Sequence, residues 1–192
     1  MDKQKEILAA ALKLFVEFGF HGTPTSRIAK EAGVANGTLF HYFKTKDELV
    51  VALYNGIKND LNGFLYARIS DSDSIEERFK SLFINSIKWA LKNNEGFYFV
   101  QQFHFSPHLS LVSPEEIEKQ TSGHIRLLQE AIQAGAIKSM PTDLIYTMIS
   151  SQIYGIHQYL ATAALPTDEE DKIIGESFEM IYKMLKVDLR AR

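Results

Sequence analysis

The sequence has no cysteine, which excludes a disulfide framework and a thiolate metal site. It also has no run that approaches the roughly 18 apolar residues of a transmembrane helix. Lys13 and Glu17 interrupt the apolar stretch near the N-terminus, so we interpret this stretch as an amphipathic helix and not as a signal peptide. The net charge of −3 excludes a generally basic, histone-like protein but is compatible with a local basic face. These absences are typical of a cytoplasmic protein without a membrane segment.

Signatures of catalysis and of cofactor binding are absent as well. The chain contains no G-x-S-x-G, H-E-x-x-H, P-loop or dinucleotide-binding glycine pattern, and no Glu-x-x-His pair of the di-iron type. His104 and His108 lie four residues apart, but Pro107 between them prevents their presentation on one helical face. We therefore expect a protein that is not an enzyme, with no cofactor and no metal site.

Helical patterns fill the chain instead. Apolar residues recur at helical spacing over residues 3–19, which predicts an amphipathic helix with one buried face. Two short helices follow, joined by a tight turn at Gly33, and together they form a helix-turn-helix. Capping boxes at 45–48 and 74–77 then open two longer helices.

These signals predict an all-α fold of about nine helices without a sheet. A three-helix domain that contains the helix-turn-helix is expected at residues 1–47, followed by a helical body at residues 48–192. Thr23 is the expected cap of the second helix, with Pro24 at its first position. The aromatic segment 97–105 suits a strand by composition, but we predict a short buried helix because the rest of the chain is helical. The other helices are expected at 36–43, from Thr45 to about Ile69, from Ser74 to about Lys92, from Pro114 to Gly135, over about 20 residues from Thr142, and from Thr167 to about Leu189.

The third helix carries an unusual set of residues, NGTLFHYF. Gly37 costs about 1 kcal/mol relative to Ala inside a helix, but its missing Cβ would let the backbone approach a phosphate or a sugar closely. Thr38 offers a hydroxyl to phosphate and a methyl group to thymine, and the neighbouring amide, imidazole and phenol can bind bases or phosphates. Leu39, Phe40 and Phe43 are expected to form the core of the module. We therefore predict contacts with DNA from Asn36, Gly37, Thr38, His41, Tyr42 and Lys46.

Residues 7–49, ILAAALKLFVEFGFHGTPTSRIAKEAGVANGTLFHYFKTKDEL, resemble the N-terminal DNA-binding domain of the TetR family of transcriptional regulators. The shared elements are LF-E-GF-G at the end of the first helix, the IA--AGV block, GTL--YF and KTKDEL. The resemblance implies that Thr23 and Thr25 bind phosphate at the start of the second helix. It also implies that four residues of the third helix face the major groove, namely Asn36, Gly37, Thr38 and His41. Tyr42 and Lys46 would hold the DNA backbone.

The resemblance further implies a ligand-responsive regulator whose C-terminal domain binds a small molecule and forms a homodimer through the last two helices. A repressor of this kind binds a palindromic operator in double-stranded DNA and is released by a small, largely apolar molecule. The apolar stripes of the last two helices fit a dimer interface, but the same periodicity fits the core of a monomer. An activator, a regulator that requires a co-repressor, and a helical small-molecule-binding protein without specific DNA binding remain alternatives.

The small-molecule site is expected among aromatic and polar-tipped residues of the middle helices, since apolar walls with a few polar groups suit an apolar ligand. The same residues could instead form packed core. The candidates are Trp89, Phe99, Phe103, His104, Tyr154 and His157.

Overall fold

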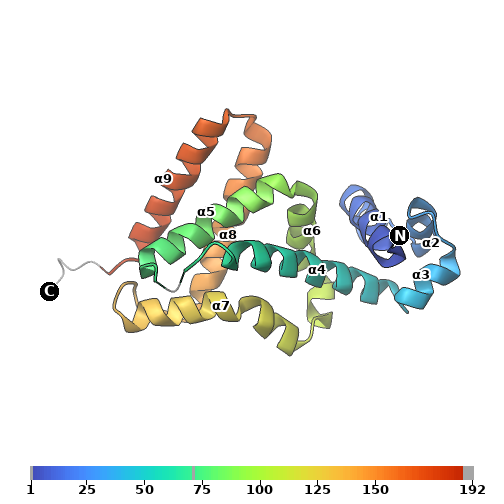
Figure 1. Ribbon diagram of the computed structural model, residues 1–192, viewed down its shortest axis with the longest axis horizontal. Helices are drawn as coiled ribbons and strands as arrows, with labels where there is room; N and C mark the ends of the chain where they lie inside the picture. The colour runs from blue at the N-terminus through green and yellow to red at the C-terminus, as the bar shows by residue number, and fades with distance from the viewer. Residues whose placement is uncertain (1, 71, 188–192) are drawn as a thin grey trace. The chain divides into compact units, whose positions relative to one another are not determined.

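The computed structural model describes residues 2–70 and 72–187. Over these residues the chain forms nine α-helices and one short 3₁₀ helix, η1 (Figure 1). The only β-structure in the described part of the chain is an isolated bridge between Ile137 and Lys186. The all-α prediction is therefore confirmed.

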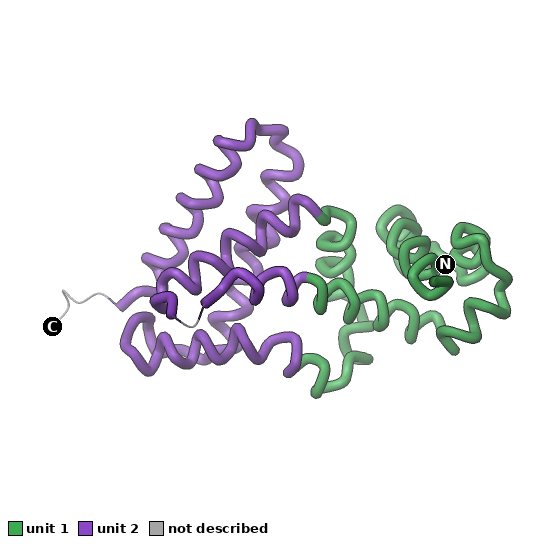
Figure 2. The backbone as a smooth tube through the Cα atoms, in the orientation of Figure 1, with its two compact units in different colours: residues 1–60, 93–117 green, residues 61–92, 118–192 purple. Residues whose placement is uncertain are grey.

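By packing, the chain divides into two compact units (Figure 2). The first unit joins residues 1–60 with the distant segment 93–117, and the second contains residues 61–92 and 118–192. This division differs from the predicted boundary after residue 47, because a later helix supplies part of the core of the N-terminal unit.

The first unit contains the helix-turn-helix and the helices that pack against it. α1 contacts α2, α3 and α6, and α6 contacts η1. The elements of this unit are α1 (Lys3–Phe18), α2 (Thr25–Glu31), α3 (Asn36–Tyr42), most of α4 (Lys46–Tyr66), α6 (Asn94–His104), η1 (Pro107–Leu111) and the start of α7 (Pro114–Gln133).

The second unit contains the end of α4, most of α7 and three further helices. α5 contacts both α8 and α9, which also contact each other. The three further helices are α5 (Ile75–Lys92), α8 (Thr142–Ala163) and α9 (Thr167–Leu185). α9 ends at Leu185, and the predicted end near Leu189 lies outside the described residues.

The capping box at Ser74 forms as the sequence predicts, while at Thr45 the returning carboxylate binds the N–H one residue earlier, at Lys44. The Glu48 N–H donates to Thr45 Oγ1 at 3.1 Å, and the Glu48 carboxylate accepts from the Lys44 N–H at 2.7 Å. At the start of α5, Ser74 and Glu77 exchange both bonds, at 3.2 and 2.8 Å. Each box satisfies amide groups that the first turn of a helix leaves without an intrahelical partner.

Two local predictions are wrong. α2 begins at Thr25 with Pro24 at its N-cap and no side-chain cap, so Thr23 is not the capping residue. The sequence predicts only the end of a helix at Pro107, whereas a 3₁₀ helix begins there. The buried helix predicted for residues 97–105 is confirmed as α6.

An aromatic cluster forms the centre of the first unit. Phe99 of α6 lies 6.1 Å from Phe15 of α1 and 5.6 Å from Phe20, measured between ring centroids. One turn later Phe103 stacks on Tyr54 of α4, with centroids 4.0 Å apart. Since Phe15, Phe99 and Phe103 have no exposed surface, α6 completes the core of the N-terminal helices.

We expect Phe99→Ala to lower the free energy of unfolding by about 3–5 kcal/mol, because it opens a cavity in this core. Urea unfolding followed by circular dichroism measures the change. Tyr98→Ala is the matched control, since Tyr98 neighbours Phe99 on the same helix but is exposed. A Phe99→Ala protein as stable as the control would show that the cluster does not support the unit.

Candidate nucleic-acid interface

A short turn sets the angle between α2 and α3. Gly33 adopts φ +65°, a left-handed conformation that glycine accepts without steric cost. The Val34 N–H then donates to the Ala29 carbonyl at 3.0 Å and closes the end of α2. Leu39 and Phe43 are buried and attach α3 to the rest of the unit. The remaining surface of α3 is thereby left open to solvent.

This open surface includes most of the α3 residues that the sequence predicts to face DNA. Thr38 is half-buried, and Phe40, expected in the core, is 37% exposed instead. The imidazole of His41 lies edge-on to the Tyr42 ring, with centroids 5.5 Å apart. The exposed predicted residues of α3 are Asn36, Gly37, His41 and Tyr42.

Gly37 has no structural reason to be glycine within the described chain. Its φ is not in the left-handed region, and a Cβ built on it would meet no described atom within 4 Å. The helix-propensity cost of Gly37 is therefore not offset by packing. An open position without a Cβ on the exposed front of a helix suits close approach by a second molecule.

Thr23 does not fit its predicted role. Its side chain is fully buried, and its hydroxyl donates to the carbonyls of Leu14 at 3.0 Å and Gly19 at 2.9 Å. The hydroxyl therefore links α1 to the turn before α2 and does not reach a phosphate. The predicted phosphate contact by this side chain is wrong. The contact predicted for Thr25, which is half-buried in the first turn of α2, stays a prediction.

Lys46 is held against the protein at the start of α4. Its ammonium donates to the Phe20 carbonyl and lies 6.0 Å from the centroid of the Phe15 ring. An ammonium has three donors, so a contact with DNA remains available to it. Lys46 thus also connects α4 to the turn between α1 and α2, which sequence reasoning missed.

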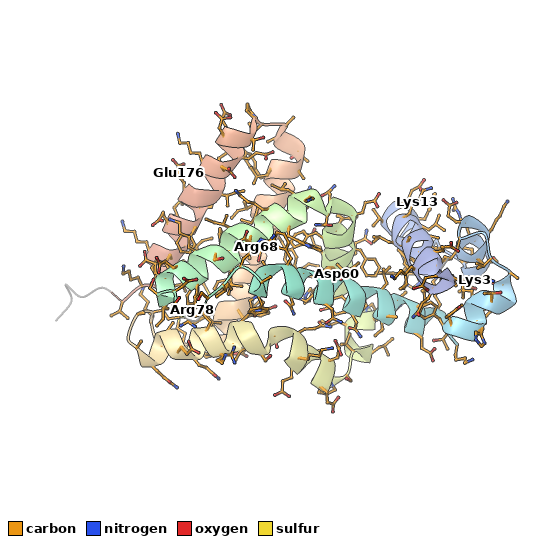
Figure 3. All side chains as sticks on the ribbon, viewed as in Figure 1. Lys3, Lys13, Asp60, Arg68, Arg78 and Glu176 are labelled. Carbon is orange, nitrogen blue, oxygen red and sulfur yellow. The ribbon has the colours of Figure 1, made fainter. Side chains whose placement is uncertain are left out.

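Other basic side chains of the unit differ in how far their charge is neutralised. Lys13, labelled in Figure 3, bonds Glu31 at 2.6 Å, and this hydrogen bond raises the pKa of Lys13 and lowers the pKa of Glu31. Arg27, by contrast, lies over the Phe18 ring at 3.7 Å and forms no ion pair among the described residues. The sequence analysis did not predict a role for Arg27, a cation of α2.

The six predicted ligand contacts do not gather in one unit. Phe99 and Phe103 lie in the aromatic core of the first unit, where the packed-core alternative describes them. His104 is half-buried in the same unit, and burial lowers its pKa, with a smaller effect from the charge of Lys58. The other three, Trp89, Tyr154 and His157, belong to the second unit.

Within the second unit, His157 is buried, and burial lowers its pKa against an opposing effect of the Ala90 backbone. A hollow of about 130 Å³, partly open to solvent, lies between other residues of this unit. Arg78, labelled in Figure 3, bonds Glu130 there at 2.8 Å. None of the predicted ligand contacts lines this hollow, whose walls are Tyr66, Ile69, Arg78, Leu82, Gly123, Arg126, Leu127 and Glu130.

The described residues show neither a membrane-spanning helix nor a cluster of metal ligands. Among the helices of residues 2–70 and 72–187, none is long and apolar enough to cross a membrane. The same part of the chain contains no group of three or more His, Cys, Asp or Glu residues that could hold a metal ion.

Comparisons with known proteins agree on one relationship. The sequence profile of "Bacterial regulatory proteins, tetR family" matches residues 7–53. The chain is 25% identical over 179 residues to the Fatty acid metabolism regulator protein of Bacillus subtilis, which covers 91% of this chain and 90% of that protein. It is 27% identical over 158 residues to the HTH-type transcriptional repressor KstR2 of Mycobacterium tuberculosis, over 77% of this chain and 76% of that protein. The crystal structure of a tetR family transcription regulator from Shewanella sp. PV-4 superposes with a TM-score of 0.90 at 28% identity, over 98% of this chain and 100% of that chain.

We expect Thr23→Val to lower the free energy of unfolding by about 1–3 kcal/mol, because it removes the donor from two buried carbonyls without changing the shape of the side chain. Chemical unfolding of the purified chain measures the loss. Thr25→Val serves as the control, because Thr25 has no hydrogen bond of its hydroxyl within the described residues. Equal stability of the two variants would show that the Thr23 hydroxyl does not support the fold.

Proposed function

This chain belongs to the tetR family of bacterial regulatory proteins and is a DNA-binding transcriptional regulator, and from this premise we propose that it acts as a dimeric repressor released from its operator by a small, largely apolar molecule. The observation that carries the proposal is the open surface of α3, where polar residues surround a glycine that packing does not require. Recognition helices of this motif bring their N-terminal residues to base edges in the major groove. Asn36 is the predicted reader of bases, because its amide can bind adenine bidentately.

One relative supports repression as the proposed sign of regulation. The M. tuberculosis protein is named a transcriptional repressor, and the similarity to it extends over 77% of this chain. A repressor blocks transcription while it occupies its operator. The proposed effector would therefore act by ending DNA binding.

A homodimer would bring two recognition helices to the two halves of a palindrome. Half-sites must then lie about one helical turn (~34 Å) or a multiple apart. α8 and α9 expose large apolar side chains, and Met180 is 74% exposed. Such apolar surface is typical of a protein interface, and we assign it to the dimer. Its members are Leu144, Tyr159, Met180 and Met184.

The effector is expected to be a fatty-acid-derived molecule, because the B. subtilis relative is named a fatty acid metabolism regulator and is similar over 91% of this chain. A ligand can shift a conformational equilibrium only by its differential affinity for the two states. α4 begins in the first unit at Lys46 and ends in the second at Tyr66. This continuous helix is the connection through which ligand binding would alter the spacing of the recognition helices.

Specific DNA binding is tested by a gel shift with the DNA that flanks the gene of this protein, at two salt concentrations and with random-sequence competitor. We expect a discrete complex that survives the competitor and weakens at higher salt, since phosphate contacts release counterions. Binding that the competitor removes equally at both salt concentrations would contradict a specific operator in this DNA.

Gly37→Ala tests the open surface of α3. We expect the folded protein to gain up to about 1 kcal/mol of stability from the better helix former, while operator affinity falls by about tenfold because the new methyl group holds the DNA away. Thermal unfolding and gel shifts measure the two effects. Gly56→Ala is the matched control, because Gly56 is also helical and exposed with no described atom near its Cβ position. Undiminished operator affinity in Gly37→Ala would contradict the close approach.

A further inference from the structure

The hollow in the second unit has no role in the proposed function. It measures about 130 Å³ and is partly open to solvent. Its walls come from the end of α4, the loop after α4, the first half of α5 and the second half of α7. None of its lining residues lies on α8 or α9, so the surface that we assign to the dimer does not include it.

The hollow carries a positive charge in excess. Among the described residues that line it, the charged ones are Arg78, Arg126 and Glu130. Glu130 Oε2 accepts from Arg78 Nη2 at 2.8 Å, whereas Glu130 Oε1 lies 3.9 Å from Arg126 Nε, beyond hydrogen-bond distance. Two guanidinium groups therefore share one carboxylate. An anion that enters the hollow would balance the second cation.

Arg78 also has a donor that the chain does not satisfy. Its Nε is buried and has no hydrogen-bond partner within the described residues. The side chain as a whole is 18% exposed and lines the hollow, so a molecule in the hollow can contact its guanidinium. A buried donor without an acceptor is unfavourable, and more so when it belongs to a charged group. A carboxylate would satisfy it, because its two oxygens match the planar fork of a guanidinium.

Apolar side chains form another part of the wall. Leu82 of α5 and Leu127 of α7 are 8% and 5% exposed, and they line the hollow together with Ile69. An engineered cavity of ~150 Å³ with apolar walls binds benzene. A space of about 130 Å³ therefore admits a compact apolar group beside the leucines, but not a long alkyl chain.

Tyr66 gives the hollow a wall that is already in position. Its hydroxyl bonds His124 Nδ1 at 2.8 Å, and this hydroxyl lies directly against Gly123 of α7. A Cβ at position 123 would collide with the Tyr66 hydroxyl, so the glycine is required for the tyrosine to reach His124. A site that is formed before its ligand arrives loses less free energy to ordering when the ligand binds.

We propose that this hollow binds a small carboxylate with a compact apolar body, and that Arg78 binds the carboxylate beside Arg126. The apolar body would lie against Leu82 and Leu127. This inference goes beyond the proposed function, because the hollow is too small for a long alkyl chain and is a second site, separate from that of the effector.

Benzoate and benzamide test the proposal, because they have nearly the same shape and differ in charge. We expect isothermal titration calorimetry of the full chain, in a buffer free of carboxylate and phosphate, to show benzoate binding at least about tenfold more tightly than benzamide. Inorganic phosphate is the third probe and should bind at least about tenfold more weakly than benzoate, because it has no apolar body. Benzoate that binds no more tightly than benzamide would overturn the proposal, and so would phosphate that binds as tightly as benzoate.

Arg78→Met assigns the binding to the hollow. The preference for benzoate over benzamide should disappear, because the substitution removes both the charge and the buried donor. Arg68→Met is the matched control, since it changes the net charge equally. Arg68 is exposed, lies over the Phe64 ring at 3.5 Å and does not line the hollow; both arginines are labelled in Figure 3. A preference that survives in Arg78→Met, or that is lost equally in Arg68→Met, would overturn the proposal.

Arg78→Lys keeps the test decisive if Arg78→Met does not fold. Lysine retains the positive charge beside Glu130 but has neither Nε nor a planar fork. We expect the melting temperature, measured by circular dichroism, to stay close to that of the wild type, while benzoate binds at least about fivefold more weakly. Unchanged benzoate affinity in the folded Arg78→Lys protein would overturn the proposal.

Discussion

The aromatic contacts between α6 and the N-terminal helices are the interaction on which the first unit depends. Phe99 packs between Phe15 and Phe20, and Phe103 stacks on Tyr54 of α4. A head of three short helices buries too little apolar surface to be stable by itself, since a small module gains little from its own core. The chain supplies the missing surface from a segment about 80 residues downstream. The DNA-binding helices and α6 therefore share one core. A substitution in the core of either part would alter the packing of the other.

This shared core also explains how α3 can present so much of its surface. Two buried anchors, Leu39 and Phe43, hold the helix, and the turn at Gly33 sets its direction. Thr23 and Lys46 stabilise this arrangement through hydrogen bonds to backbone carbonyls of α1 and of the turn that follows it. Thr23 and Lys46, which the family resemblance assigns to DNA contacts, thus also stabilise the helices around the recognition helix.

The helices could be predicted from the sequence because their signals are local. The capping bonds of Thr45 and Ser74 need only residues within one turn, and both form. The core of the first unit could not be predicted, since the partners of Phe99 are more than 70 residues away in the chain. The hydrogen bonds of the Thr23 hydroxyl cannot be predicted for a similar reason, because its acceptors lie on another helix and in a turn, which a short motif does not describe.

Gly37 shows how sequence and proposed function are connected. Glycine is unfavourable for helix formation, and neither the backbone conformation of Gly37 nor its packing in the described protein requires it. Gly56 is equally open, so a glycine that packing does not require is not by itself a binding site. Gly37 differs in its position on the exposed front of α3, beside Asn36, His41 and Tyr42. There the missing Cβ leaves room for the DNA backbone that the proposed function brings to this helix.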